Sequence, residues 1–193
     1  MSRPWQDVLD FWFLAPDDPG YLKTRAEWFQ KNAAFDDAIR QRFGHLVEQA
    51  VAGGLQEWQS EPQGALARVL LLDQFTRNIW RDTDRAFAGD GQALALAQSM
   101  IASGADKTLS TAEAQFIYLP LMHAEDLPTQ EQCVALYTDL AARDPAQANA
   151  LDFAVQHRDI IARFGRFPHR NGQLGRTSTA QEIEFLTQPG SSF

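Results

Sequence analysis

The stretch NAAFDDAIRQRFGHLVEQAVAGG, residues 32–54, carries the pattern that decides the fold. Its apolar side chains recur at the three- and four-residue spacing of an amphipathic helix, and they are Phe35, Ile39, Phe43, Leu46, Val47, Ala50 and Val51. Asn32 is a residue type that caps helix N-termini, and the pair Gly53-Gly54 is typical of a helix end. The pattern therefore predicts one helix between Asn32 and Gly53.

Similar start and stop signals recur along the chain. A Ser or Thr followed three residues later by Gln has the spacing of a capping box, and the pairs are Ser60/Gln63, Thr129/Gln132 and Ser178/Gln181. Asp90 is expected to cap a helix that ends at Gly104, and Pro120 to kink or interrupt another. A helix that follows Pro145 should end at Gly165.

Because no segment alternates with period two and no strand–helix alternation occurs, we predict an all-α fold. The expected architecture is about seven or eight helices packed as antiparallel hairpins, with a looser stretch over residues 15–30. The length of 193 residues and the absence of a linker or low-complexity segment predict a single helical domain, 1–193.

Composition and charge exclude several classes of protein. The single Cys133 excludes an intrachain disulfide and a cysteine zinc cluster, which fits a reducing compartment. A net charge of −8 disfavours nucleic-acid binding, because phosphate contacts require a basic surface. No apolar run is long enough to span a bilayer, and the N-terminus lacks the basic start of a signal peptide. We therefore expect a cytoplasmic protein that binds neither membranes nor nucleic acids.

The stretch HRDIIARFGRFPHRNGQLGR, residues 157–176, is basic within this acidic chain, because it contains five arginines and two histidines. Pro168 forces the preceding residue into an extended conformation, so Arg166, His169 and Arg170 are expected on a loop. Arginine forks suit planar carboxylates and phosphates. The basic stretch therefore meets either an anionic ligand or the carboxylates of the protein itself.

A second polar group lies in LLLDQFTRNIWR, residues 70–81. Asp73 and Arg77 are four residues apart and can pair on one helix face, and Arg81 extends the polar surface. The pair is either a structural ion pair or a ligand-binding arginine with its orienting carboxylate. His157 shares a predicted face with Phe153, so it is either a hydrogen-bonded core residue or an acid–base group.

Motifs for metals, nucleotides and covalent catalysis are missing from the sequence. The four histidines form no H-x-x-x-H or H-E-x-x-H pair, and no P-loop or G-x-S-x-G elbow occurs. Cys133 lies among apolar positions and is expected in the core. We expect no metal and no cofactor, and the candidates for acid–base catalysis are His157 and His169.

Four ordered blocks, VLDFWF, LLLDQFTRNIWR, FIYLPLMHAED and HRDIIARFGRFPHRNGQLGRTST, resemble the uncharacterised bacterial family catalogued as domain of unknown function 924. The resemblance covers nearly the whole chain, and the departures, such as Thr76 where the family usually has Pro, touch no charged position. It implies an all-α array of helical hairpins similar to the tetratricopeptide superfamily. It implies no activity and no catalytic residue.

Three hypotheses about function follow. The first is a pocket for a small carboxylate or phosphate ligand, lined by Asp73, Arg77, Arg81, His123, Arg158, Arg163, Arg166, His169 and Arg170. The second is a peptide- or protein-binding adaptor of the tetratricopeptide-like type. The third is an enzyme acting on a small metabolite, with His157 or His169 as acid and base.

Overall fold

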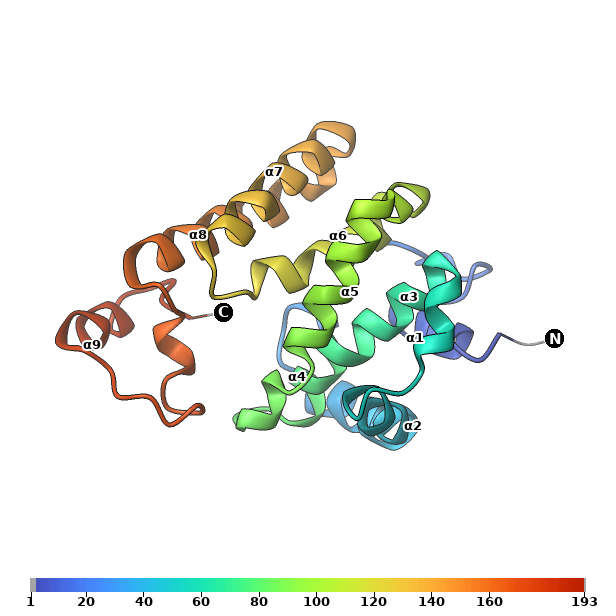
Figure 1. The fold of residues 1–193 in the computed structure, drawn as a ribbon. Helices are drawn as coiled ribbons and strands as arrows, with labels where there is room; N and C mark the ends of the chain where they lie inside the picture. Colours follow the sequence, from blue (N-terminus) through green and yellow to red (C-terminus); the bar gives the residue numbers. More distant parts are fainter. Residues whose placement is uncertain (1–2, 193) are drawn as a thin grey trace. The chain divides into compact units, whose positions relative to one another are not determined.

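The computed structural model describes residues 3–192, and it contains helices and no β-strand in that range (Figure 1). Its α-helices are α1 (Gln6–Phe13), α2 (Ala33–Val51), α3 (Pro62–Val69), α4 (Thr76–Ile79), α5 (Asp90–Ser103), α6 (Thr111–Met122), α7 (Leu127–Arg143), α8 (Ala148–Phe164) and α9 (Ala180–Leu186). Between α3 and α4 the chain forms a π-helix, Leu70–Phe75. The nine labelled helices of residues 3–192 therefore form eight separate rods, which confirms the all-α prediction.

Short 3₁₀ helices connect several of these rods: Ala26–Trp28, Gln56–Ser60, Asp84–Phe87, Ala105–Thr108, Pro145–Gln147 and Pro168–Arg170. The chain divides into two compact units. Unit 1 runs to Arg81 and from Arg85 to Pro120, and unit 2 holds Asp82–Asp84 and the chain from Leu121 onward. The single domain over 1–193 stays a prediction.

Unit 1 is built around aromatic side chains. Trp12 of α1 is only 1% exposed and stacks on Trp28, with ring centroids 6.0 Å apart. Phe75 and Phe116 contact the same indole, each with a centroid distance of 5.5 Å. Each fully buried ring of this kind stabilises the fold by about 2–3 kcal/mol. The high aromatic content of the sequence is therefore largely a property of this core.

The π-helix lies against the start of α5. A Cβ added to Gly89 would lie 2.1 Å from the carbonyl oxygen of Leu72, so only glycine permits this close approach of two backbones. The next residue, Asp90, begins α5 and faces Arg77. The prediction that Asp90 caps this helix was wrong, because Gly89 occupies the cap position and the Asp90 carboxylate binds an arginine instead.

Unit 2 contains the helical pair α7 and α8, which lie side by side and are joined by the 3₁₀ helix Pro145–Gln147 (Figure 1). The end of α6 is capped from α7, because the Gln130 amide donates to the carbonyl oxygens of Met122 and Ala124, at 2.6 and 2.8 Å. The apolar core of this unit contains Ile160, Ile161 and Phe167, packed against Leu127, Phe164 and Phe185.

Several predicted helix ends are confirmed. The Asn32 side chain accepts a hydrogen bond from the Phe35 amide at 3.1 Å, as an N-cap does. Gly104 and Gly165 end their helices in the left-handed conformation, with φ of 74° and 67°. Pro120, by contrast, does not interrupt its helix, because α6 continues past it to Met122.

The three predicted capping boxes were wrong. Helix α3 starts with Pro62, a residue pre-organised for the first helical turn, and the Ser60 hydroxyl donates to the Glu57 carbonyl instead. Asp126 caps α7 by accepting from the Thr129 amide at 3.0 Å. At α9 the box is Thr179/Glu182, one residue after the predicted pair, because the carboxylate is the stronger acceptor.

Within residues 3–192, none of the helices combines the length and the apolar character that crossing a bilayer requires.

Candidate functional site

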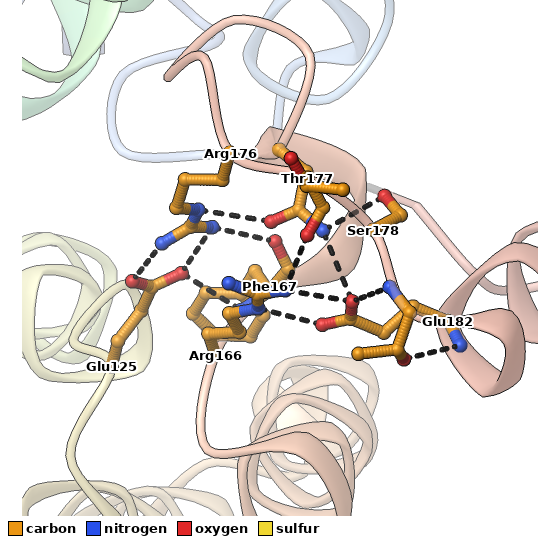
Figure 2. Close-up of polar contacts among 9 residues, drawn as sticks. Glu125, Arg166, Phe167, Arg176, Thr177, Ser178 and Glu182 are labelled. Carbon is orange, nitrogen blue, oxygen red and sulfur yellow. Dashed lines mark hydrogen bonds and ion pairs between the residues drawn. The ribbon is translucent and has the colours of Figure 1, made fainter.

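The loop that follows α8 holds a network of charged side chains in unit 2 (Figure 2). Gly165 turns the chain out of α8, and Phe167, which is fully buried, anchors it. The next residue, Pro168, opens a 3₁₀ turn that presents His169 and Arg170. The predicted extended conformation before Pro168 is confirmed, and His169 and Arg170 lie in a 3₁₀ turn of the predicted loop.

Glu125 and Arg176 form the first half of the network. Two guanidinium nitrogens of Arg176 donate to the two carboxylate oxygens of Glu125, at 2.6 and 3.0 Å. The same carboxylate accepts from the amide of Phe167 at 2.8 Å, and Arg176 donates to the carbonyl of that residue at 3.0 Å. Although burial raises the pKa of Glu125, these hydrogen bonds hold it below its usual range. This pair fixes both polar groups of the Phe167 backbone.

Arg166 and Glu182 form the second half. Arg166 donates to both oxygens of Glu182, at 2.6 and 2.8 Å, and to the Thr177 carbonyl at 2.9 Å. Glu182 is also the third residue of α9, where it completes the capping box, and it accepts from the Thr179 amide at 2.7 Å. The hydrogen bond from Arg166, followed by that from the Thr179 amide, lowers the pKa of Glu182 to about 2.

Asn171 connects the two halves. Its oxygen accepts from Arg176 at 2.9 Å, and its amide nitrogen donates to the Ser178 hydroxyl at 3.0 Å. The same nitrogen lies 3.4 Å from a carboxylate oxygen of Glu182. Figure 2 shows Glu125, from the residues after α6, bound to Arg176 and Phe167, and Glu182 of α9 bound to Arg166. Much of the basic stretch therefore meets carboxylates of its own unit.

Two imidazole rings and the guanidinium of Arg170 surround the same phenylalanine. The rings of His157 and His169 lie 5.5 and 5.6 Å from the Phe167 ring, and the guanidinium of Arg170 lies over it at 4.4 Å. Arg170 also donates to the His123 carbonyl at 3.0 Å. The rings of His123 and His157 are 6.3 Å apart. We call these four residues, His123, His157, His169 and Arg170, the histidine–arginine cluster.

Burial keeps two of the three imidazoles neutral. It lowers the pKa of His157 to about 3, helped by the nearby His123 and Arg170. Burial, together with the charge of Arg170, lowers the pKa of His169 to about 4. The Nδ1–H of His157 donates to the Phe153 carbonyl at 2.7 Å, so Nε2 is its acceptor nitrogen.

The cluster has a buried part and an accessible edge. His157 is 5% exposed and Arg170 is 7% exposed, whereas His123 and His169 are only partly covered. An anion that approached past the two edge imidazoles would meet a guanidinium that is largely removed from water. Strongly shifted histidines next to a buried cation are typical of functional sites.

The remaining predicted residues of unit 2 lie outside this cluster. Arg158 pairs with the exposed Asp159 at 2.6 Å. The Arg163 guanidinium lies over the rings of Phe164 and Phe185, at 4.6 and 5.5 Å. Both arginines therefore have local partners on the helix or on its neighbour.

The predicted residues of unit 1 form two separate ion-pair groups. Arg77 lies 3.3 Å from Asp73 and binds Asp90 through both of its terminal nitrogens, at 2.8 and 3.0 Å. Arg81 binds Asp36 at 2.5 and 2.9 Å. Asp73 is fully buried within the π-helix, and π-helical turns are rare and frequent at functional sites.

Sequence reasoning did not place four network residues in the candidate site: Glu125, Asn171, Arg176 and Glu182. A usable signal existed for Glu182, because Thr179-x-x-Glu182 is a capping box with the preferred carboxylate. The pair of Glu125 and Arg176 has no local signal, since 51 residues separate its members. Among the residues that the structure describes, no three His, Cys, Asp or Glu side chains are arranged to hold a metal ion.

Comparison with known proteins places the chain in a family. No curated protein matches it. A solved structure of a protein of unknown function, ATU0120 from Agrobacterium tumefaciens, is 38% identical to it, with a TM-score of 0.81 over 94% of this chain and 96% of that one. The model of the bacterial protein family of unknown function DUF924 matches residues 8–190. The chain therefore belongs to the DUF924 family.

Proposed function

We propose that the protein binds a small anion, a carboxylate or a phosphate, at the histidine–arginine cluster of unit 2. The observation that carries the proposal is the position of Arg170, which is 7% exposed and lies near the imidazoles of His157 and His169 at the edge of an ion-pair network. In that network three guanidinium groups, Arg166, Arg170 and Arg176, meet two carboxylates, Glu125 and Glu182. A guanidinium that is largely removed from water is a group that recognises carboxylates and phosphates strongly.

The imidazoles make this binding sensitive to pH. An anion beside His169 would offset the charge of Arg170, which contributes to lowering the pKa of that imidazole. Bound anion therefore raises the histidine pKa and makes proton uptake easier. Affinity should rise as the pH falls, and binding should consume protons.

Isothermal titration calorimetry with sulfate and malonate at constant ionic strength, which measures affinity and binding heat, tests the proposal. Sulfate keeps its charge between about pH 5 and pH 8, so any pH dependence belongs to the protein. Saturable binding that strengthens toward the lower pH supports the proposal. A ligand at about 100 times its dissociation constant should also add ~2.7 kcal/mol to the free energy of unfolding.

Arg170→Gln and Arg158→Gln form a matched pair, because each removes one guanidinium from unit 2. Binding should disappear in the first variant and persist in the second, whose arginine pairs with the exposed Asp159. His169→Gln, at a partly exposed edge position, serves if Arg170→Gln does not fold, and it should weaken binding and abolish proton uptake. Equal losses in the two arginine variants, or no saturable binding, would overturn the proposal. The adaptor and enzyme hypotheses stay predictions.

A further inference from the structure

Unit 1 contains a cavity of about 300 Å³ that belongs to none of the predicted site residues. Its floor is one face of α1, because Gln6, Leu9, Asp10 and Phe13 follow each other at helical spacing. Trp5, Tyr21 and Glu113 contribute to the walls. This volume lies at the lower end of the range for small-molecule sites.

The floor and walls are aromatic and apolar where they are most buried. Trp5, Leu9 and Phe13 are 3%, 6% and 1% exposed, respectively. Gly64 permits the position of Trp5, because a Cβ there would lie 2.8 Å from the indole nitrogen. Tyr21 adds a third ring at the more exposed side. Aromatic faces attract cations through their ring quadrupoles.

Two carboxylates, Asp10 and Glu113, line the same cavity. Asp10 accepts from the Gln6 amide at 2.8 Å, and Glu113 accepts from the amide and hydroxyl of Ser110, at 2.9 and 2.7 Å. Neither carboxylate forms an ion pair within residues 3–192. Arg3, at the rim, pairs with Glu61 at 3.2 Å, and its guanidinium lies over the Trp5 ring, 5.2 Å from the centroid.

From these observations we infer that the cavity binds a small organic ammonium ion, with its charge near Asp10 and Glu113 and its hydrocarbon part against Trp5, Leu9 and Phe13. Both carboxylates act on Tyr21, which lines the same cavity. Burial raises the pKa of Tyr21 most, and the negative charges of Glu113 and Asp10 raise it further. This site has the opposite charge preference to the histidine–arginine cluster and lies in the other unit.

Isothermal titration with three probes of similar shape tests the inference: n-butylamine, which is a cation at neutral pH, n-butanol and butyrate. The amine should bind saturably, the alcohol at least about tenfold more weakly, and the carboxylate not at all. Comparable binding of the alcohol, or no saturable binding of the amine at millimolar concentration, overturns the inference.

Asp10→Asn and Glu113→Gln remove charge and keep the acceptor oxygens that serve Gln6 and Ser110, so both variants should fold. Each should weaken amine binding about tenfold. The exposed Glu57 lies outside the cavity, and Glu57→Gln makes the same change of net charge. It should leave the affinity unchanged. Equal affinity in all four proteins would show that the cavity carboxylates do not hold the cation.

Discussion

Arg176 binds Glu125 through two hydrogen bonds, and both residues also bind the backbone of Phe167. Glu125 accepts from the Phe167 amide, and Arg176 donates to the Phe167 carbonyl. The ion pair therefore holds a buried aromatic residue at the centre of unit 2. The side chains of Arg176 and Glu125 are 22% and 25% exposed, so the ion pair is neither a surface pair nor a fully buried one.

We predict that Glu125→Gln lowers the free energy of unfolding by about 2 kcal/mol, because it leaves Arg176 without its charge partner. A double-mutant cycle with Arg176→Gln, measured by urea unfolding, should give a coupling of about 1 kcal/mol or more. Arg158→Gln, which removes an exposed pair, should change stability by less than about 0.5 kcal/mol. A coupling near zero would show that the pair contributes nothing measurable.

Glu182 should determine stability in strong acid. Its pKa is about 2 in the folded protein against an ordinary value of 4.5, so the stability it contributes is complete above 4.5 and is lost as the pH falls toward 2. Glu182→Gln should therefore flatten the dependence of unfolding free energy on pH in that window. An unchanged profile in acid titrations followed by circular dichroism would contradict the assignment.

The buried histidines should act at milder pH. His157 and His169 have folded pKa values of about 3 and about 4 against 6.5 unfolded, so protons bind the unfolded state first. Stability is complete above 6.5 and falls as the pH decreases below it, by ~1.4 kcal/mol per pH unit for each histidine. His169→Gln should remove the contribution of one of these two histidines to the pH dependence of the unfolding free energy between pH 6.5 and 4. An unaltered slope would mean that His169 titrates normally.

The contact between Gly89 and the π-helix gives a matched pair of glycine variants. Gly89→Ala would drive its Cβ to 2.1 Å from the Leu72 oxygen, and we expect a loss of at least about 2 kcal/mol. Gly91, two residues later in α5, has nothing within 4 Å of such a Cβ. Gly91→Ala should therefore stabilise the protein by ~0.5–1 kcal/mol, as alanine does in helices. Thermal unfolding measures both, and similar effects in the two variants would exclude the close approach.

Cys133 should be chemically inert in the native protein. Burial raises the pKa of its thiol to about 12, so almost no thiolate is present at neutral pH. Labelling by a disulfide reagent should follow global unfolding, with the rate in native buffer far below that in urea. Fast labelling without denaturant would show that α7 opens locally.

The sequence predicted helices well and contacts poorly. The period of Phe35, Ile39 and Phe43 predicted α2 because burial on one face repeats with the helical turn. Caps were harder, since neighbouring Ser, Thr and Asp residues compete for the same amide. At α9 the carboxylate of Glu182 decided for Thr179 over Ser178.

The π-helix and the carboxylate partners of the arginines could not be read from spacing. The π-helix packs closely against Gly89, a tertiary contact, and no pattern in LLLDQF distinguishes it from an α-helix. Arg166 pairs with Glu182 and Arg176 with Glu125, which lie 16 and 51 residues away. The sequence left two possible partners for the basic stretch, an anionic ligand or carboxylates of the protein. The structure shows that carboxylates of the chain bind much of it.

The single carboxylate of Glu182 completes the capping box of α9 with Thr179 and also binds Arg166. Positions 166, 179 and 182 therefore all depend on this carboxylate. Loss of Glu182 would remove the carboxylate partner of Arg166 and also break the capping box of α9. Loss of Thr179 would affect only the capping box. Across the DUF924 family, substitutions at positions 166 and 182 should therefore arise together in evolution, and position 179 should drift more independently.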